Sequence, residues 1–209
     1  MAIRISRKTM SEGLNWLARR DGDMARVLEL VGPPPLRTRK PGFSSLFKSI
    51  CAQQVSAASA RAVAGRLEAA TGPLTPANFL ALDDGALKAV GLSRQKMSYG
   101  RAMAQAMEDG EFNLRSVARM GDEAAIARLT ELKGVGRWTA EVYLLFALKR
   151  PDIWPKGDLA VIRGLQRMKK LETQPSETEL QEMAEPWRPW RSVAARLMWH
   201  YYGNAPDEG

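Results

Sequence analysis

Two glycines one residue apart stand between two apolar segments, in the stretch LKGVGRWTA. The segment before them, residues 122–129, and the segment after them, up to residue 148, both repeat apolar residues at helical spacing. A connection this short makes the two helices fold back on each other. Glycine adopts backbone angles that side chains disfavour and lets another backbone approach closely. We therefore expect Gly134 and Gly136 to form the turn of a helix-hairpin-helix over about residues 122–148.

The rest of the chain also reads as helices separated by breaks. Residues 32–42, GPPPLRTRKPG, contain three successive prolines that cannot continue a helix, which predicts an extended basic connector. Helical spacing predicts two short helices within 11–31, and further helices over 43–70, 94–109, 158–170, 176–184 and 190–202. No alternating strand pattern is present. The predicted fold is all-α, with a single domain over residues 1–209.

Composition excludes several kinds of active site. The one cysteine, Cys51, allows no internal disulfide, no cysteine-rich zinc site and no four-cysteine iron–sulfur cluster. The one histidine, His200, excludes HExxH chemistry, and we find no Ser-His-Asp arrangement around it. The N-terminus lacks the apolar core of a signal peptide, and no later stretch reaches membrane-spanning length. We expect a cytoplasmic protein without a membrane partner, associated with the nucleoid if it is prokaryotic.

The charge balance and the hairpin both suit a polyanion. Thirty-one Lys and Arg residues against 23 Asp and Glu residues leave a net charge of +8, which favours partners such as nucleic acid. The first amides of a helix have no partners inside it, and the helix dipole favours negative charge there. The amides near Gly134 and Gly136 are therefore candidates to bind a phosphate. A tight turn without a ligand is the alternative, and for an isolated G-x-G it is the more common case.

Five blocks, in family order along the chain, resemble the helix-hairpin-helix DNA glycosylase superfamily, in its 3-methyladenine DNA glycosylase II type. LKGVGRWTA is similar to that superfamily's L-P-G-[VI]-G-x-x-T-A, with Lys133 at the usual proline. WPKGDLAVIRG places Asp158 where the superfamily keeps its catalytic aspartate, and WRPWRSVAARLMWHY resembles the family's C-terminal helix. SICAQQVSAASA and GLSRQKMSYG resemble earlier segments. The resemblance implies two helical lobes flanking a cleft, in a compact form without a separate N-terminal β-rich domain.

The activity that this resemblance implies is hydrolysis of the N-glycosidic bond of alkylated purines, of the 3-methyladenine and 7-methylguanine class. The base would be flipped out of duplex DNA, and an abasic site would remain for base excision repair. Glycosylases that also cut the strand carry a lysine two residues after the second glycine. Trp138 stands there in this chain, and an indole cannot form a Schiff base. The resemblance therefore implies a monofunctional hydrolase without lyase activity.

Asp158 is the expected catalytic residue. It follows Gly157 and precedes an apolar-periodic segment, where an aspartate is most often a helix N-cap. Capping and catalysis can coexist in one carboxylate. An ionised carboxylate stabilises the oxocarbenium-like sugar that forms as the base departs, and it can orient or deprotonate the attacking water.

Aromatic residues are expected to form the base pocket, because the face of an indole attracts cationic alkylated bases. The best-placed candidates by family position are Trp138 and Trp190, and the weaker ones are Tyr143, Trp187 and Trp154. Ordinary core packing is the alternative for each tryptophan. For Trp199, packing of the last helix is the expectation.

The DNA contacts are also implied by the resemblance. The family fills the hole left by the flipped base from the turn after its first core helix, here AQQVS. Gln54 is the expected wedge, with Gln53 and Val55 beside it, and a solvated helix end is the alternative. A DNA phosphate is expected at Gly134, Gly136 and Arg137. The main-chain carbonyls expected to hold a monovalent cation, Na⁺ or K⁺, are those of Thr130, Leu132 and Val135. No other cofactor is expected.

Other function classes stay open at this point. A non-catalytic helix-hairpin-helix module would bind the DNA backbone for another protein, but it would need neither Asp158 nor paired tryptophans. A glycosylase for oxidised or mismatched bases is disfavoured by the missing cysteines and the missing lysine. A helical protein for a small apolar ligand leaves the charge and the glycines unexplained. The expected partner is double-stranded DNA with damaged bases, bound by a monomer.

Overall fold

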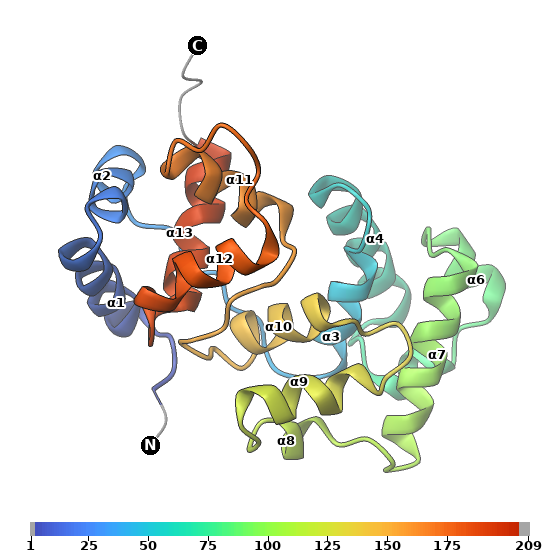
Figure 1. Cartoon of the computed structure of the whole chain (residues 1–209). Helices are drawn as coiled ribbons and strands as arrows, with labels where there is room; N and C mark the ends of the chain where they lie inside the picture. The colour runs from blue at the N-terminus through green and yellow to red at the C-terminus, as the bar shows by residue number, and fades with distance from the viewer. Residues whose placement is uncertain (1–2, 205–209) are drawn as a thin grey trace. The chain divides into compact units, whose positions relative to one another are not determined.

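The structure, a computed structural model, describes residues 3–204, and every regular element in that range is a helix (Figure 1). This confirms the all-α fold class. The chain divides into two compact units, one made of residues up to Thr38 and from Leu144 onward, the other of Arg39–Tyr143. We call them the terminal unit and the central unit and describe each by itself. They match the two helical lobes that were expected.

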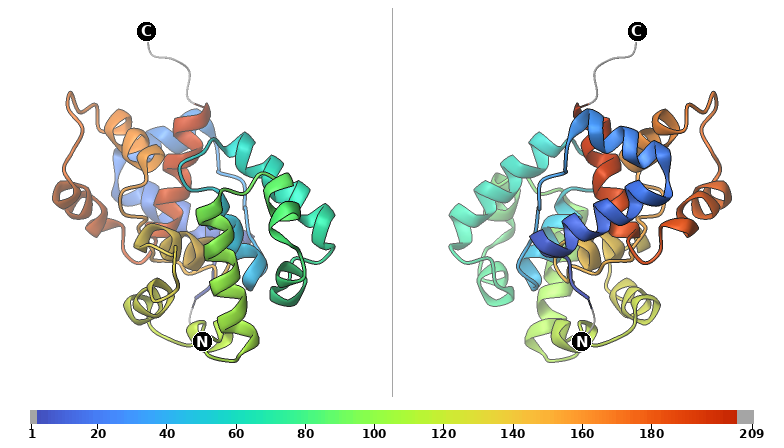
Figure 2. Two further views of the ribbon diagram at one scale, coloured as in Figure 1. Left: turned by 90° about the vertical axis from the view of Figure 1, so that its right-hand side faces the viewer. Right: turned by 90° about the vertical axis from the view of Figure 1, so that its left-hand side faces the viewer.

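The terminal unit is built around its last helix. Its elements are α1 (Arg7–Arg20), α2 (Gly22–Val31), the last turn of α10 (Arg137–Phe146), α11 (Leu159–Met168), α12 (Glu177–Ala184), η1 (Glu185–Trp187) and α13 (Arg191–Asn204). Helices α1, α2 and α11 all pack against α13 (Figure 2). Gly164 of α11 permits this, since a Cβ there would lie 2.6 Å from the Met198 carbonyl oxygen. The result is a buried α13 that carries the side chains described below.

The central unit holds the helix-hairpin-helix. It contains α3 (Phe43–Cys51), α4 (Ala57–Thr71), α5 (Pro76–Leu80), α6 (Asp84–Ala89), α7 (Arg94–Glu108), α8 (Leu114–Val117), α9 (Asp122–Thr130) and the start of α10. Phe43, Phe47 and Phe79 form an aromatic cluster with ring centroids 4.8–5.7 Å apart. Gly100 lets α7 lie on this cluster, because a Cβ there would be 2.5 Å from the Phe79 ring. Aromatic packing thus fixes α3, α5 and α7 together.

One predicted helix was wrong. The helix expected over 43–70 is two helices, α3 and α4, separated by the turn at residues 52–56. Gln54 has φ +55° there, which no helix continues, and the Ser56 side chain accepts from the Ser59 amide to begin α4. The helix expected over 122–129 is α9, with Gly121 as its N-cap. Residues 32–42 form no helix, as the prolines predicted. Within the described residues, no helix is long and apolar enough to cross a membrane.

Candidate active site and DNA-binding hairpin

Asp158 is the N-cap of α11, and its side chain accepts hydrogen bonds from two backbone amides of that helix and from an indole. Its Oδ1 accepts from the amides of Ala160, at 3.1 Å, and Val161, at 3.0 Å. The indole Nε1 of Trp199 donates to the same oxygen at 2.8 Å. The side chain lies in a nearly closed setting, with 8% of the residue exposed. Donors of this kind stabilise negative charge on the oxygen, so the helix start holds a carboxylate in one fixed orientation.

Trp199 does more than pack α13. Its ring stacks on Phe146 of α10, with centroids 5.2 Å apart and planes inclined by 26°, while its Nε1 bonds to Asp158. Sequence reasoning assigned this tryptophan to core packing, because its helical spacing matches that of its buried neighbours. The residue spacing within α13 gives no sign that the indole reaches a carboxylate on α11.

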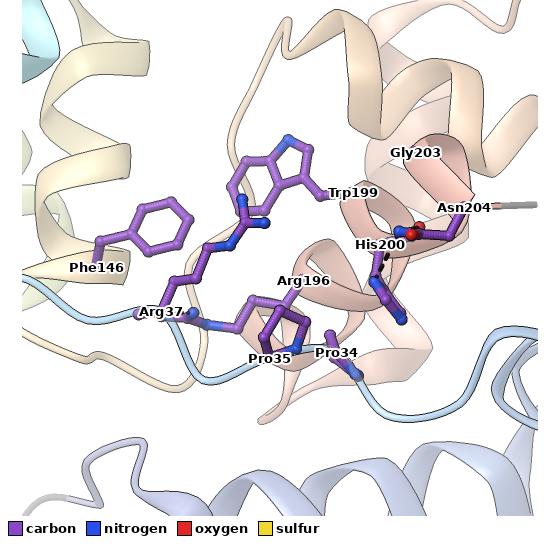
Figure 3. A pocket seen from close by; sticks show the side chains of 9 residues that line it. All are labelled: Pro34, Pro35, Arg37, Phe146, Arg196, Trp199, His200, Gly203 and Asn204. Atoms are coloured by element: carbon purple, nitrogen blue, oxygen red, sulfur yellow. Dashed lines mark hydrogen bonds between the residues drawn. The ribbon is translucent and has the colours of Figure 1, made fainter. Parts of the chain in front are cut away.

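A cavity of about 350 Å³ opens beside this aromatic pair (Figure 3). Trp199 and Phe146 line it together with two arginines, Arg37 and Arg196. The remaining lining residues are Pro34, Pro35, His200, Gly203 and Asn204. A volume of this size accommodates a nucleobase-sized ligand. The cavity is therefore an aromatic-walled pocket next to the side chain that bonds Asp158.

Arg196 is a buried cation without a carboxylate partner among the described residues. The residue is only 3% exposed. Its Nη1 donates to the Arg37 carbonyl at 2.8 Å and its Nη2 to the Leu145 carbonyl at 3.0 Å, while its guanidinium lies 4.5 Å from the Phe146 ring centroid. Its Nε has no hydrogen-bond partner. Burial lowers the pKa of Arg196 to about 10, so the side chain stays positively charged at neutral pH.

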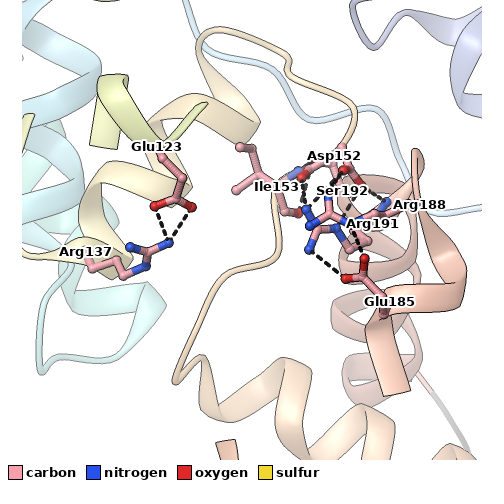
Figure 4. Close-up of polar contacts among 8 residues, drawn as sticks. All are labelled: Glu123, Arg137, Asp152, Ile153, Glu185, Arg188, Arg191 and Ser192. Atoms are coloured by element: carbon pink, nitrogen blue, oxygen red, sulfur yellow. Dashed lines mark hydrogen bonds and ion pairs between the residues drawn. The ribbon is translucent and has the colours of Figure 1, made fainter. Parts of the chain in front are cut away.

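Polar contacts anchor the loop that leads to Asp158. Asp152 accepts from Arg191 Nε at 2.8 Å and from Arg188 Nη1 at 2.6 Å (Figure 4). The Ile153 amide donates to the Ser192 hydroxyl at 2.9 Å. These bonds tie residues 152–153 to the start of α13, the helix that carries Trp199. Sequence reasoning did not identify this cluster, because the partners are nearly forty residues apart.

The hairpin of the central unit needs only one of its two glycines for its backbone. Gly134 has φ +86°, and a Cβ there would lie 2.2 Å from Cδ2 of Tyr99. Gly136 does not have a positive φ, and a Cβ there would meet no heavy atom within 4 Å. Both glycines lie in the turn as expected, but only Gly134 uses a backbone angle that side chains disfavour. Within residues 3–204, the amides of both glycines donate to no acceptor, which leaves them available to a ligand.

The residues expected to hold a cation lie around the same turn. Thr130, Leu132 and Val135 line a surface pocket of about 470 Å³ together with both hairpin glycines. The Leu132 carbonyl accepts from the Val135 amide at 3.0 Å, and a carbonyl oxygen retains a second lone pair for a cation. Main-chain oxygens suit a hard monovalent ion, so the residues fit such a group. Among the described residues, no cluster of His, Cys, Asp or Glu is arranged to hold a metal ion.

Gln53 ties the turn after α3 to the hairpin. Its Nε2 donates to the Gly134 carbonyl at 3.0 Å and to the Thr139 hydroxyl at 2.8 Å. Lys96 Nζ donates to the carbonyls of Cys51 and Gln53 at 2.8 and 3.0 Å. Gln54, the expected wedge, is exposed and has φ +55°. Gln53 thus connects the turn that carries Gln54 to the glycine turn of the hairpin.

Replacing Gln53 by leucine is expected to lower the free energy of unfolding by about 1–3 kcal/mol, because the Gly134 carbonyl loses its donor within a half-buried contact. Urea denaturation followed by circular dichroism measures this. Gln54→Asn is the matched control, since asparagine tolerates a left-handed backbone, and it should leave the stability unchanged. An unchanged midpoint for Gln53→Leu would show that the tie is not a stabilising contact.

The other predicted site residues lie as follows. Arg137 bonds to Glu123 at 2.7 and 3.0 Å (Figure 4) and to Glu141 at 2.9 Å. The Glu123 hydrogen bond is the main cause that raises the pKa of Arg137. Trp138 is half-buried and Val55 exposed. Their roles toward DNA stay predictions.

The remaining aromatic candidates are buried. The Tyr143 hydroxyl accepts from the Gly42 amide at 3.1 Å, and Trp190 packs on Gly13 of α1, where a Cβ would lie 2.9 Å from the indole. Trp187 Nε1 donates to Asp21 at 3.0 Å, and its ring lies 5.6 Å from that of Trp154. Each has a packing role in its own unit, and their roles as base-pocket residues stay predictions.

Comparison with known proteins adds to this geometry. The family model described as HhH-GPD superfamily base excision DNA repair protein matches residues 47–189. The chain is 29% identical over 186 residues to DNA-3-methyladenine glycosylase 1 of Schizosaccharomyces pombe, covering 86% of this chain and 82% of that protein. It is 28% identical over 134 residues to DNA-3-methyladenine glycosylase 2 of Escherichia coli, covering 64% of this chain and 44% of that protein.

Solved structures show the same fold. The S. pombe 3-methyladenine DNA glycosylase in complex with abasic DNA superposes with a TM-score of 0.82 at 27% identity, covering 90% of this chain and 95% of that one. The DNA-3-methyladenine glycosidase of Bacillus halodurans gives 0.78 at 28% identity, covering 93% and 89%. With a family model that matches well over half of its residues, the chain belongs to the HhH-GPD superfamily of base excision DNA repair proteins.

Proposed function

We propose that this protein is a monofunctional DNA glycosylase that hydrolyses the N-glycosidic bond of alkylated purines in duplex DNA. The observation that carries the proposal is the Asp158 carboxylate, held by the start of α11 and by Trp199 beside an aromatic-walled cavity. Support comes also from the similar proteins, which are named as 3-methyladenine DNA glycosylases, one of them bound to abasic DNA.

The chemistry follows from the carboxylate and its aromatic neighbour. The extruded base enters the cavity beside Trp199 and Phe146, which offer it a stacking surface. The C–N bond breaks, its electron pair leaves with the base, and C1′ becomes oxocarbenium-like. The negative charge of Asp158 stabilises that sugar. Water then adds its oxygen to C1′ and passes a proton to the Asp158 carboxylate, and an abasic site remains.

DNA binding is assigned to the central unit. The amides of Gly134 and Gly136, at the start of α10, bind a backbone phosphate without reading the base sequence. The carbonyls of Thr130, Leu132 and Val135 would hold a monovalent cation, which would supply positive charge beside the phosphate. Gln54 enters the duplex in place of the extruded base. The protein acts as a monomer, and its net charge of +8 makes binding weaken steeply with salt.

Strand cleavage is not part of the proposed reaction. Trp138 occupies the position at which strand-cutting glycosylases of this superfamily carry their Schiff-base lysine. The only thiol, Cys51, is buried, and burial raises its pKa to about 11, so it offers no thiolate nucleophile at neutral pH.

The test is a reaction with randomly methylated duplex DNA. The protein should release methylated purines as free bases, identified by chromatography, and strand breaks should appear only after alkali treatment. Breaks before alkali would indicate lyase activity and contradict the monofunctional assignment. Intact salt-sensitive DNA binding without release of any base would point to a non-catalytic binding module.

A further inference from the structure

The cavity of the terminal unit carries an unusual charge for a site that takes alkylated bases. Its nine lining residues include two arginines and no carboxylate. Arg196 is held by two main-chain carbonyls and has no carboxylate partner among the described residues. A buried charge without a counter-ion is costly to retain, and core packing alone would be served by an uncharged side chain. We therefore expect the Arg196 charge to act on the ligand that occupies the cavity.

Arg37 brings a second charge to the same cavity. It is exposed, and its guanidinium forms no hydrogen bond or ion pair within residues 3–204. Figure 3 shows Arg37, Arg196, Phe146 and Trp199 around the same space. The two guanidiniums differ in what they can offer. Arg196 uses two of its five N–H donors on carbonyls, while its Nε has no partner. Arg37 keeps all five of its donors for a ligand.

Damaged bases differ in their own charge, and the two arginines act on that charge. Purines alkylated at N3 or N7 are cationic in DNA, and a cation in the cavity is repelled by both guanidiniums. Hypoxanthine and ethenoadenine are neutral and present acceptor atoms at their edges, which a guanidinium binds. Asp158 acts in the opposite sense, because its negative charge favours a cation. Which bases are released then depends on two opposing effects: attraction of a cationic base by Asp158 and its repulsion by the two arginines.

We propose that Arg37 and Arg196 are specificity-determining residues that shift this site from cationic alkylated purines toward neutral purines with acceptor edges, such as hypoxanthine. This inference rests on the proposed function, since it places the extruded base in the cavity beside Trp199. What it adds is a role for two named residues in the choice between lesions. A base stacked on Trp199 meets the donors of Arg37 and the field of Arg196, and neutral bases gain from both while cationic bases lose.

Arg37 is the better residue to change. Its side chain is exposed, and only its main-chain carbonyl takes part in holding Arg196, so Arg37→Gln removes a charge and leaves that contact in place. Arg37→Lys keeps the charge and is the matched control. Arg196→Met is the second variant. It removes the Arg196 donors from the carbonyls of Arg37 and Leu145, which can reduce the amount of folded protein. The ratio of two release rates measured on one protein preparation cancels that loss.

The experiment measures single-turnover release from two duplexes that differ only in one base, hypoxanthine or 7-methylguanine. Wild-type protein should release both. Arg37→Gln and Arg196→Met should each lower the hypoxanthine-to-7-methylguanine rate ratio by about threefold to tenfold, the scale of one screened charge, and Arg37→Lys should stay within about twofold.

An unchanged ratio in both charge-removing variants overturns the specificity assignment while the glycosylase assignment stands. Release of 7-methylguanine but not of hypoxanthine by wild-type protein overturns it as well. Release of neither base, nor of any base from methylated DNA, would instead overturn the proposed function and this inference with it.

Discussion

Asp158→Asn is expected to reduce the release of methylated purines on the order of a hundredfold to a thousandfold, the scale of losing one electrostatic contact to a transition state. The variant removes the negative charge but keeps an oxygen that can accept from Ala160, Val161 and Trp199. Asparagine and aspartate are comparable N-caps, so α11 should keep its start. Single-turnover release of 7-methylguanine from a duplex, with thermal unfolding measured in parallel, tests this expectation.

Trp199→Phe is the matched control for this experiment. It keeps an aromatic ring on Phe146 but removes the Nε1 donor to Asp158. The carboxylate keeps its charge and its two amide donors, so we expect a loss of only about tenfold, corresponding to one hydrogen bond to a charged group. If Asp158→Asn releases bases at the wild-type rate, the residue is an N-cap and the catalytic assignment fails.

Gly134→Ala is the second large effect, and it acts on stability and DNA binding together. Alanine would have to adopt φ +86° with its Cβ 2.2 Å from the Tyr99 ring. The left-handed backbone costs about 1–2 kcal/mol, and displacing a packed ring costs about 1–3 kcal/mol more. We expect a lower unfolding midpoint in urea, and weaker binding to duplex DNA by fluorescence anisotropy even at a temperature where the variant is folded.

Gly136→Ala separates backbone strain from contact with DNA. The Cβ of this variant meets no protein atom within 4 Å, so its stability should equal that of the wild type. Its binding to duplex DNA should still weaken, because an added methyl group stands beside amides that are expected to hold a phosphate. Unchanged binding by Gly136→Ala would show that the phosphate does not approach this part of the turn. Wild-type stability of Gly134→Ala would contradict the strain described for the hairpin.

Local sequence patterns predicted most of the helices and the hairpin. The apolar spacing of residues 122–130 and 137–146, with Gly134 between them, needs only neighbours within a few residues to specify two helices and a turn. Asp158 as an N-cap is equally local, since its oxygen reaches amides two and three residues ahead. Helical spacing alone missed the break at Gln54, because the residues around it are compatible with a continuing helix and the turn is held by Lys96 from α7. Only the family resemblance implied a turn at AQQVS.

By itself, then, the sequence determined the all-α fold class, the glycine hairpin and the position of the carboxylate, because each depends on periodicity or on a cap within one or two turns. Only the tertiary structure decided which side chains surround that carboxylate. Trp199 reaches Asp158 from 41 residues away, and Arg37 and Arg196 line one cavity although they are 159 residues apart. Such neighbours are set by the packing of α11 on α13, where Gly164 meets the Met198 carbonyl. The spacing of residues along the chain does not predict this packing, because it depends on which apolar surfaces of distant helices are buried against each other.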